Sequence, residues 1–192
     1  MKVTFPDELV LYDLEYTAWE GSQERKWSGP NEYREIIQIG AIRVSPDLVE
    51  RDSFLEYVRP VKNPQLSDFI TELTGISQDD IDTKGISFST AFEKFRAFVG
   101  ETTSYCWGRD TEILEENTGF AGVPQSLPRC QFADLRPIAR EAFSDAGVDI
   151  DDYSSGTLIQ AFGIDSGRRA HDAINDMRNL LDAIKIVNGR AT

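Results

Sequence analysis

The chain has 192 residues, of which 33 are acidic and 20 basic, and its formal net charge is −13. This length is typical of one domain with a substantial core, so we expect a single domain over residues 1–192. An acidic balance argues against a protein that coats long duplex DNA, which needs a basic surface, and leaves only local contact with a short or single strand. No apolar run approaches the roughly 20 residues that cross a bilayer, and the first residues carry no secretory pattern.

Two cysteines, Cys106 and Cys130, are the only thiols in the sequence. Their spacing suits no zinc site, and two cysteines in a chain of this length indicate reduced core thiols. We therefore expect a reducing, cytoplasmic location and no membrane association.

The first third of the sequence is rich in predicted strands. Apolar and β-branched runs predict strands at 9–16, 35–44 and 53–59, and the short polar turn between the last two favours antiparallel pairing. The loop 18–34 between the first two strands is long, and long loops are often functional. It contains Trp19 and Trp27, which could stack on a base, although we favour packing that fixes the loop.

The remaining two thirds alternate between helices and strands. Ser67 is a predicted N-cap, and SQDD from Ser77 has the spacing of a capping box. We predict helices at 65–74, after 77, and at 89–100, 110–117, 136–146, 157–162 and 170–187, with strands at 104–107 and 131–134. This order predicts an α/β fold with a mixed sheet and helices on its faces.

Two carboxylates end the first predicted strand, LVLYDLEYT at 9–17. Side chains alternate between the faces of a strand, so Asp13 and Glu15 point the same way as Leu9 and Leu11. Unpaired charges on a core-facing line would repel each other and lose hydration, and so require compensation.

Two further carboxylates lie at comparable places. Asp110 follows a predicted strand, and alone it could equally be a helix N-cap. Asp176 borders the apolar stripe of the last helix, and alone it would be a boundary charge. Together with Asp13 and Glu15 they predict a site for hard divalent cations, Mg²⁺ or Mn²⁺, because Zn²⁺ would want histidine or thiolate ligands.

The single histidine, His171, precedes Asp176 by five residues, which is 140° beyond a full turn of a helix. The two side chains could not meet on a rigid helix, so we expect His171 in the preceding loop or first turn. A surface or capping histidine is the alternative.

Three motifs resemble those of the DEDDh 3′–5′ exonucleases, which have a ribonuclease-H-like fold: D-L-E-Y-T at 13–17, W-G-R-D at 107–110 and H-D-A-I-N-D at 171–176. EIIQIGAI at 35–42 is similar to the second strand of that family, and ITELTGIS at 70–77 to its leucine-wedge segment. The similarity extends over most of the chain.

Two details resemble the branch that trims RNA 3′ ends: Asn179, three residues after Asp176, and the W-G-x-D form of the second motif. Ala18 departs from the Gly or Cys that many members have after the threonine. The long, charged loop 18–34 is a further departure, so substrate preference carries over poorly.

The resemblance implies a two-metal hydrolase. Asp13, Glu15 and Asp176 would hold one Mg²⁺ or Mn²⁺ ion, and Asp13 would bridge to a second that Asp110 supports through water. Neutral His171 would accept the proton of the attacking water. We expect the acidic cluster to raise the pKa of His171 when the metals are absent.

The resemblance also implies a substrate, namely single-stranded nucleic acid with a free 3′ end, RNA favoured over DNA. Backbone groups of Tyr16 and Thr17 would meet the terminal nucleotide, with Leu73 against its base. Arg168, with its neighbour Arg169, could contact phosphates or form a solvated charge pair.

Three alternatives stay open: a DNA exonuclease or proofreading subunit, a catalytically silent interaction module, and an acidic Ca²⁺-binding module, which lacks a suitable loop. The oligomeric state, monomer or homodimer, is open as well.

Overall fold

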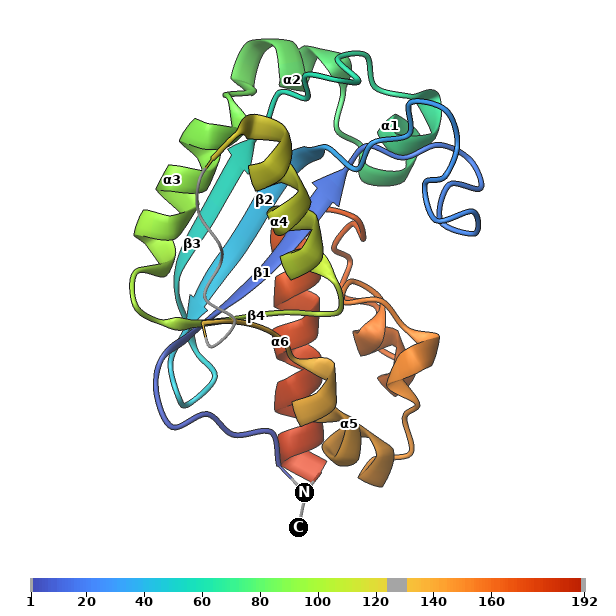
Figure 1. Cartoon of the computed structure of the whole chain (residues 1–192). Helices are drawn as coiled ribbons and strands as arrows, with labels where there is room; N and C mark the ends of the chain where they lie inside the picture. The colour runs from blue at the N-terminus through green and yellow to red at the C-terminus, as the bar shows by residue number, and fades with distance from the viewer. Residues whose placement is uncertain (1, 124–130, 191–192) are drawn as a thin grey trace.

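A computed structural model of the chain describes residues 2–123 and 131–190. Its centre is a mixed sheet of five strands in the order β3-β2-β1-β4-β5 (Figure 1). The strands are β1 Leu9–Tyr16, β2 Ile36–Val44, β3 Glu50–Tyr57, β4 Thr103–Cys106 and β5 Phe132–Asp134. β1, β2 and β3 pair antiparallel, whereas β4 is parallel to β1 and β5 parallel to β4. The predicted sheet of three antiparallel strands followed by parallel strands is therefore confirmed.

Helices cover both faces of this sheet. The helices are α1 Asp68–Thr74, α2 Gln78–Lys84, α3 Phe88–Val99, α4 Asp110–Ala121, α5 Arg136–Asp145 and α6 Ala173–Arg190, with short 3-10 turns η1 Ile150–Asp152 and η2 Leu158–Phe162. Figure 1 shows α3 and α4 on one side of the sheet and α6 on the other. None of the helices described is long and apolar enough to cross a membrane.

The alternation of β1 creates the two layers of the core. Val10, Tyr12 and Leu14 pack with residues of α3 and α4, while Leu9 and Leu11 pack with residues of α5 and α6. Because every second residue faces the same layer, Asp13 and Glu15 continue the face on which α6 lies.

The ends of the short helices follow the sequence signals. Ser67 caps α1, since its hydroxyl accepts the N–H of Ile70 at 3.2 Å. Ser77 and Asp80 form the expected capping box of α2. Ile70 and Ile81 join a third apolar cluster, so α1 and α2 are anchored at the end of the sheet where β1 finishes.

Some predicted boundaries are wrong by a few residues. The last helix begins at Ala173 rather than at 170, because the Asp172 carboxylate accepts the N–H of Asn175 at 3.0 Å and so caps the helix there. β3 begins earlier than predicted, at Glu50, and α4 continues to Ala121. Cys106 is buried and free, and Cys130 lies outside the described residues.

A glycine on β2 sets how closely α6 approaches the sheet. A Cβ at Gly40 would lie 2.6 Å from Cβ of Ala173, so no larger residue fits there. The N–H of Ala173 donates to Oε1 of Gln38 at 3.1 Å, which fixes the first turn of α6 on β2. Gly40 pairs with Asp13 across the strands, so this contact brings the start of α6 beside the carboxylates of β1.

Candidate active site

The two carboxylates of β1 are enclosed by protein. Asp13 is 8% exposed and Glu15 is 7% exposed. The hydroxyl of Ser155 donates to Oδ1 of Asp13 at 3.2 Å. No lysine or arginine within the described residues forms an ion pair with either carboxylate, so their charges lack the compensation that burial demands.

Asp176 comes from the first turn of α6 and is 3% exposed. Its carboxylate accepts the backbone N–H of His171, at 3.1 Å for Oδ1 and 3.3 Å for Oδ2. On another side it meets the backbone of Gly156, where a Cβ would overlap the carboxylate. The orientation of Asp176 is therefore fixed by two loops.

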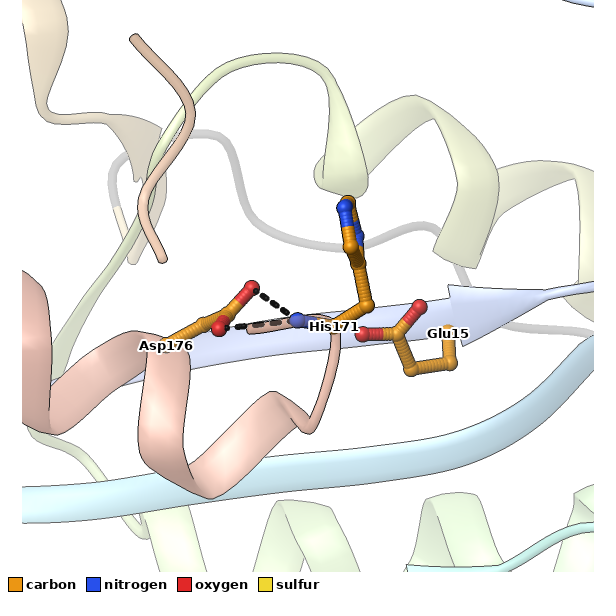
Figure 2. Close-up of side chains that lie close together, drawn as sticks. All are labelled: Glu15, His171 and Asp176. Carbon is orange, nitrogen blue, oxygen red and sulfur yellow. Dashed lines mark hydrogen bonds between the residues drawn. The ribbon is translucent and has the colours of Figure 1, made fainter. Parts of the chain in front are cut away.

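His171 lies two residues before α6, in a loop, which is one of the two positions that the rotation argument allows. Its backbone has φ +60°, a left-handed conformation that is uncommon outside glycine. Figure 2 shows the backbone nitrogen facing Asp176 while the imidazole extends in another direction. Ligand atoms of Glu15, His171 and Asp176 all lie within 4.8 Å of one another.

Asp110 is the first residue of α4, directly after the turn that follows β4. The alternative N-cap interpretation is wrong, because Arg109 occupies the cap position and makes no side-chain capping bond. The Asp110 carboxylate is therefore not used to cap this helix.

All five predicted residues, Asp13, Glu15, Asp110, His171 and Asp176, line one cavity of about 390 Å³. The strand, the start of α4 and the start of α6 each supply part of it. Its other walls come from the loop after β1 and from α1, which lie side by side in Figure 1.

Burial and mutual repulsion raise the pKa values of the carboxyls that line the cavity. Burial raises the pKa of Asp176 to about 7, and burial followed by repulsion from Asp134 raises the pKa of Asp110 to about 7. Burial, then repulsion from Asp110 and Asp176, raises the pKa of Asp13, and burial likewise raises that of Glu15. These carboxyls thus hold protons when no cation balances their charge.

The imidazole behaves differently from our prediction. The expectation that the acidic cluster raises the pKa of His171 is wrong: burial, followed by the positive charge of Arg169, lowers it. His171 is therefore neutral at physiological pH and has a ring nitrogen able to accept a proton.

The donor set suits a hard divalent cation. Three enclosed carboxylates and a fourth at the start of α4 offer oxygen ligands. Their pKa values are raised because the carboxylates are buried without a balancing positive charge. Mg²⁺ and Mn²⁺ prefer such oxygen ligands. A bound cation would offset both the burial of these charges and their mutual repulsion.

Only some of the predicted substrate-binding residues line the cavity. Tyr16 and Leu73 line the cavity, whereas Thr17 and Arg168 do not. The N–H of Thr17 donates to the carbonyl of Glu35 at 2.9 Å and its carbonyl accepts Nε1 of Trp27 at 3.1 Å, so both backbone groups already have partners within the protein.

Arg168 is held by α6. Its Nη1 donates to Oδ1 of Asn179 at 3.0 Å and to Oδ2 of Asp182 at 2.8 Å. Nδ2 of Asn179 in turn donates to the carbonyl of Gly156 at 2.9 Å. Arg168 therefore supports the segment that packs on Asp176.

The sequence analysis missed Ser155 and Gly156. They belong to SSG at 154–156, just before η2, and contact Asp13 and Asp176 respectively. The only signal was a run of small residues before a short helix, which by itself indicates a turn.

The chain matches the RNase_T family model, described as exonuclease, over residues 10–184. It is 38% identical over 185 residues to human 3′-5′ exoribonuclease 1, covering 92% of this chain and 51% of that protein. It is 37% identical over 209 residues to 3′-5′ exonuclease eri1 of Schizosaccharomyces pombe, covering 92% of this chain and 66% of that protein. The chain thus spans about half to two thirds of the length of these relatives.

Among solved structures, the nuclease domain of 3′hExo, a DEDDh family member bound to rAMP, superposes with a TM-score of 0.76. The sequences are 22% identical, and the match covers 96% of this chain and 93% of that domain. This similarity confirms the ribonuclease-H-like arrangement of the elements.

Proposed function

This chain belongs to the exonuclease family, and we propose that it is a DEDDh member that removes nucleotides from the 3′ end of single-stranded RNA by metal-dependent hydrolysis. The observation that carries this proposal is the convergence of Asp13, Glu15, Asp110, His171 and Asp176 on one cavity. These residues come from three separated stretches of sequence, and burying them together serves no packing purpose.

Asp13, Glu15 and Asp176 would hold one Mg²⁺ or Mn²⁺ ion, and Asp13 and Asp110 a second. When bound, two such ions supply a nucleophilic water at neutral pH and stabilise the leaving 3′ oxygen. Ser155 and the backbone N–H of His171 orient the carboxylates of Asp13 and Asp176.

His171 acts as the general base in this proposal. Because burial lowers its pKa, the imidazole is neutral near pH 7 and can take a proton from the attacking water. Its loop is held by the N–H bond to Asp176, so the base and a metal ligand are positioned together.

The cavity also has apolar walls that suit a nucleotide. Tyr16, Trp19 and Leu73 line it and supply apolar surface for a base. The preference for RNA is supported by the exoribonuclease names of the relatives. The predicted roles of Thr17 and Arg168, the cytoplasmic location and the oligomeric state stay predictions.

The test is digestion of 5′-labelled RNA and DNA oligonucleotides, single- and double-stranded, with Mg²⁺, Mn²⁺ or chelator. We expect single-stranded RNA to be shortened from its 3′ end by one nucleotide at a time, only with the metal. If DNA is shortened faster than RNA, DNA is the preferred substrate. If neither is shortened, the proposed activity is contradicted. A 3′-phosphate on the same RNA is the matched substrate control.

A further inference from the structure

A second cavity, of about 380 Å³, adjoins the candidate active site. It lies between the loop after β1 and the end of α4, and Trp27 lines both cavities. A strand leaving the active site along this side therefore meets it next. We use the term aromatic–cation groove for the residues that line this cavity together with Lys62, which lies over two of its rings: Lys26, Trp27, Glu32, Tyr33, Arg34, Lys62, Glu116 and Phe120.

Two rings of the groove face solvent. Tyr33 is 36% exposed and Phe120 is 40% exposed, and the rings meet edge to face with centroids 5.9 Å apart. They come from the loop and from α4, which are far apart in the sequence. Exposed rings held this way bury little apolar area, so core packing does not account for them.

Cationic side chains lie close to the rings of the groove. Nζ of Lys62 lies 4.3 Å from the centroid of Tyr33 and 4.7 Å from that of Phe120. The guanidinium carbon of Arg34 lies 5.6 Å from the centroid of Trp27. Rings for bases beside cations for phosphates are the usual composition of a single-strand binding surface.

The two acidic residues that line the groove each form an ion pair with an arginine. Glu32 is paired with Arg25, and Glu116 with Arg34. In the described part of the chain, no carboxylate lies within ion-pair distance of Lys26 or Lys62. The groove therefore has a surplus of positive charge in a chain whose net charge is −13.

The loop that carries part of the groove is ordered by its own bonds. The N–H of Trp27 donates to the carbonyl of Ser22 at 2.8 Å, and Nε1 of Trp27 donates to the carbonyl of Thr17. Trp27 also packs on Tyr16, with centroids 5.6 Å apart. Trp27 is thus a fixed wall, which leaves Tyr33 and Phe120 as the stacking surfaces.

We propose that the aromatic–cation groove binds the upstream nucleotides of a single-stranded RNA whose 3′ end occupies the active site. The bases stack on Tyr33 and Phe120 once Lys62 leaves these rings to contact a phosphate, and Lys26 contacts another. This inference rests on the proposed exonuclease function, because it needs the 3′ end to lie in the first cavity. It makes the loop 18–34 a determinant of how substrate length affects the rate.

The test compares wild type with Tyr33→Ala/Phe120→Ala and with Lys26→Ala/Lys62→Ala, on single-stranded RNA from two to about ten nucleotides long. These side chains are exposed or half-buried, so folding should be unaffected. Lys2→Ala and Leu55→Ala remove an exposed cation and an exposed apolar side chain outside the groove and serve as matched controls.

We expect kcat/KM of the wild type to rise with length, and both double variants to lose about fivefold or more on the longest RNA. On the dinucleotide, which is too short to reach the groove, all proteins should act alike. Tyr33→Phe should behave as wild type because the ring is kept. If kcat/KM of the double variants rises with RNA length as it does for the wild type, the proposal is overturned. The surface would then be assigned to binding a protein partner.

Fluorescence anisotropy with labelled RNA in chelator separates this inference from the proposed function. Weaker RNA binding by the double variants than by the controls supports the groove, whether or not the protein cleaves RNA. Absence of cleavage would contradict only the proposed activity. Equal binding by all variants contradicts the groove.

Discussion

The acidic cavity should make the metal-free protein lose stability as the pH rises. The folded-state pKa of Asp176 is about 7, against an ordinary value of 3.8. The folded state therefore binds more protons than the unfolded chain between these values. The stabilising contribution is fully present below about pH 4 and is lost as the pH rises through about 7.

The size of this effect follows from the pKa values. Each pKa unit corresponds to about 1.36 kcal/mol, and two units separate pH 5 from the folded pKa of Asp176. The free energy of unfolding should therefore fall by about 3 kcal/mol between pH 5 and pH 8, with a further fall from Asp110. The two contributions need not add, because the carboxyls repel each other. Asp80, whose pKa is lowered to about 2, titrates below this range. The lowered pKa of His171 acts with the opposite sign within this range, because the unfolded chain binds that proton more tightly, and so offsets part of the fall.

The assay is urea unfolding in chelator at both pH values, repeated with Mg²⁺ at pH 8. A cation that binds only the folded state should restore about 3 kcal/mol at a concentration one hundred times its Kd. Asp176→Asn should reduce the pH dependence and stabilise the metal-free protein at pH 8, whereas Asp7→Asn, at an exposed position, should do neither. A metal-free protein equally stable at pH 5 and pH 8 would refute the reasoning.

Three further predictions concern single residues. Asp13→Asn should abolish Mg²⁺-dependent RNA cleavage with an unchanged circular dichroism spectrum; retained cleavage would remove Asp13 from the site. His171→Ala should lower kcat by about 10²-fold or more while the Kd for Mn²⁺ changes little, and an unchanged kcat would exclude it as the base. Gly156→Ala should displace the Asp176 carboxylate and lower kcat/KM about tenfold or more with weaker Mn²⁺ binding, whereas Gly119→Ala, where a Cβ meets open space, should keep full Mn²⁺ affinity.

Much of the fold could be predicted because it depends on local rules. Alternation along β1 places Asp13 and Glu15 on the face of Leu9 and Leu11 whatever the rest of the chain does. The capping box at Ser77 is likewise a short-range signal, and the structure confirms it. Helix geometry limited His171 to the preceding loop or the first turn, and the structure has it in the loop, two residues before α6.

Contacts between distant segments could not be predicted in the same way. The sequence places Arg168 near His171, which suggested either phosphate contact or a solvated charge pair, and it gave no sign that the guanidinium also binds Asn179 and Asp182. Nothing in the spacing relates Gly156 to Asp176, because their contact depends on how the segment before η2 crosses the start of α6.

The sign of the His171 pKa shift was also beyond sequence reasoning. We expected the acidic cluster to dominate, but the shift depends on how deeply the imidazole is buried and on the distance to Arg169. Both are tertiary properties, which the spacing of residues along the chain does not give.

Crystals of the protein soaked in Mn²⁺ and measured at the manganese absorption edge test the central claim most directly. We expect two anomalous peaks within about 2–2.5 Å of carboxylate oxygens, one of them shared by Asp13, Glu15 and Asp176 and the other beside Asp13 on the side of Asp110. Soaked crystals with no peak at Asp13, measured with Mn²⁺ in excess, would contradict the account.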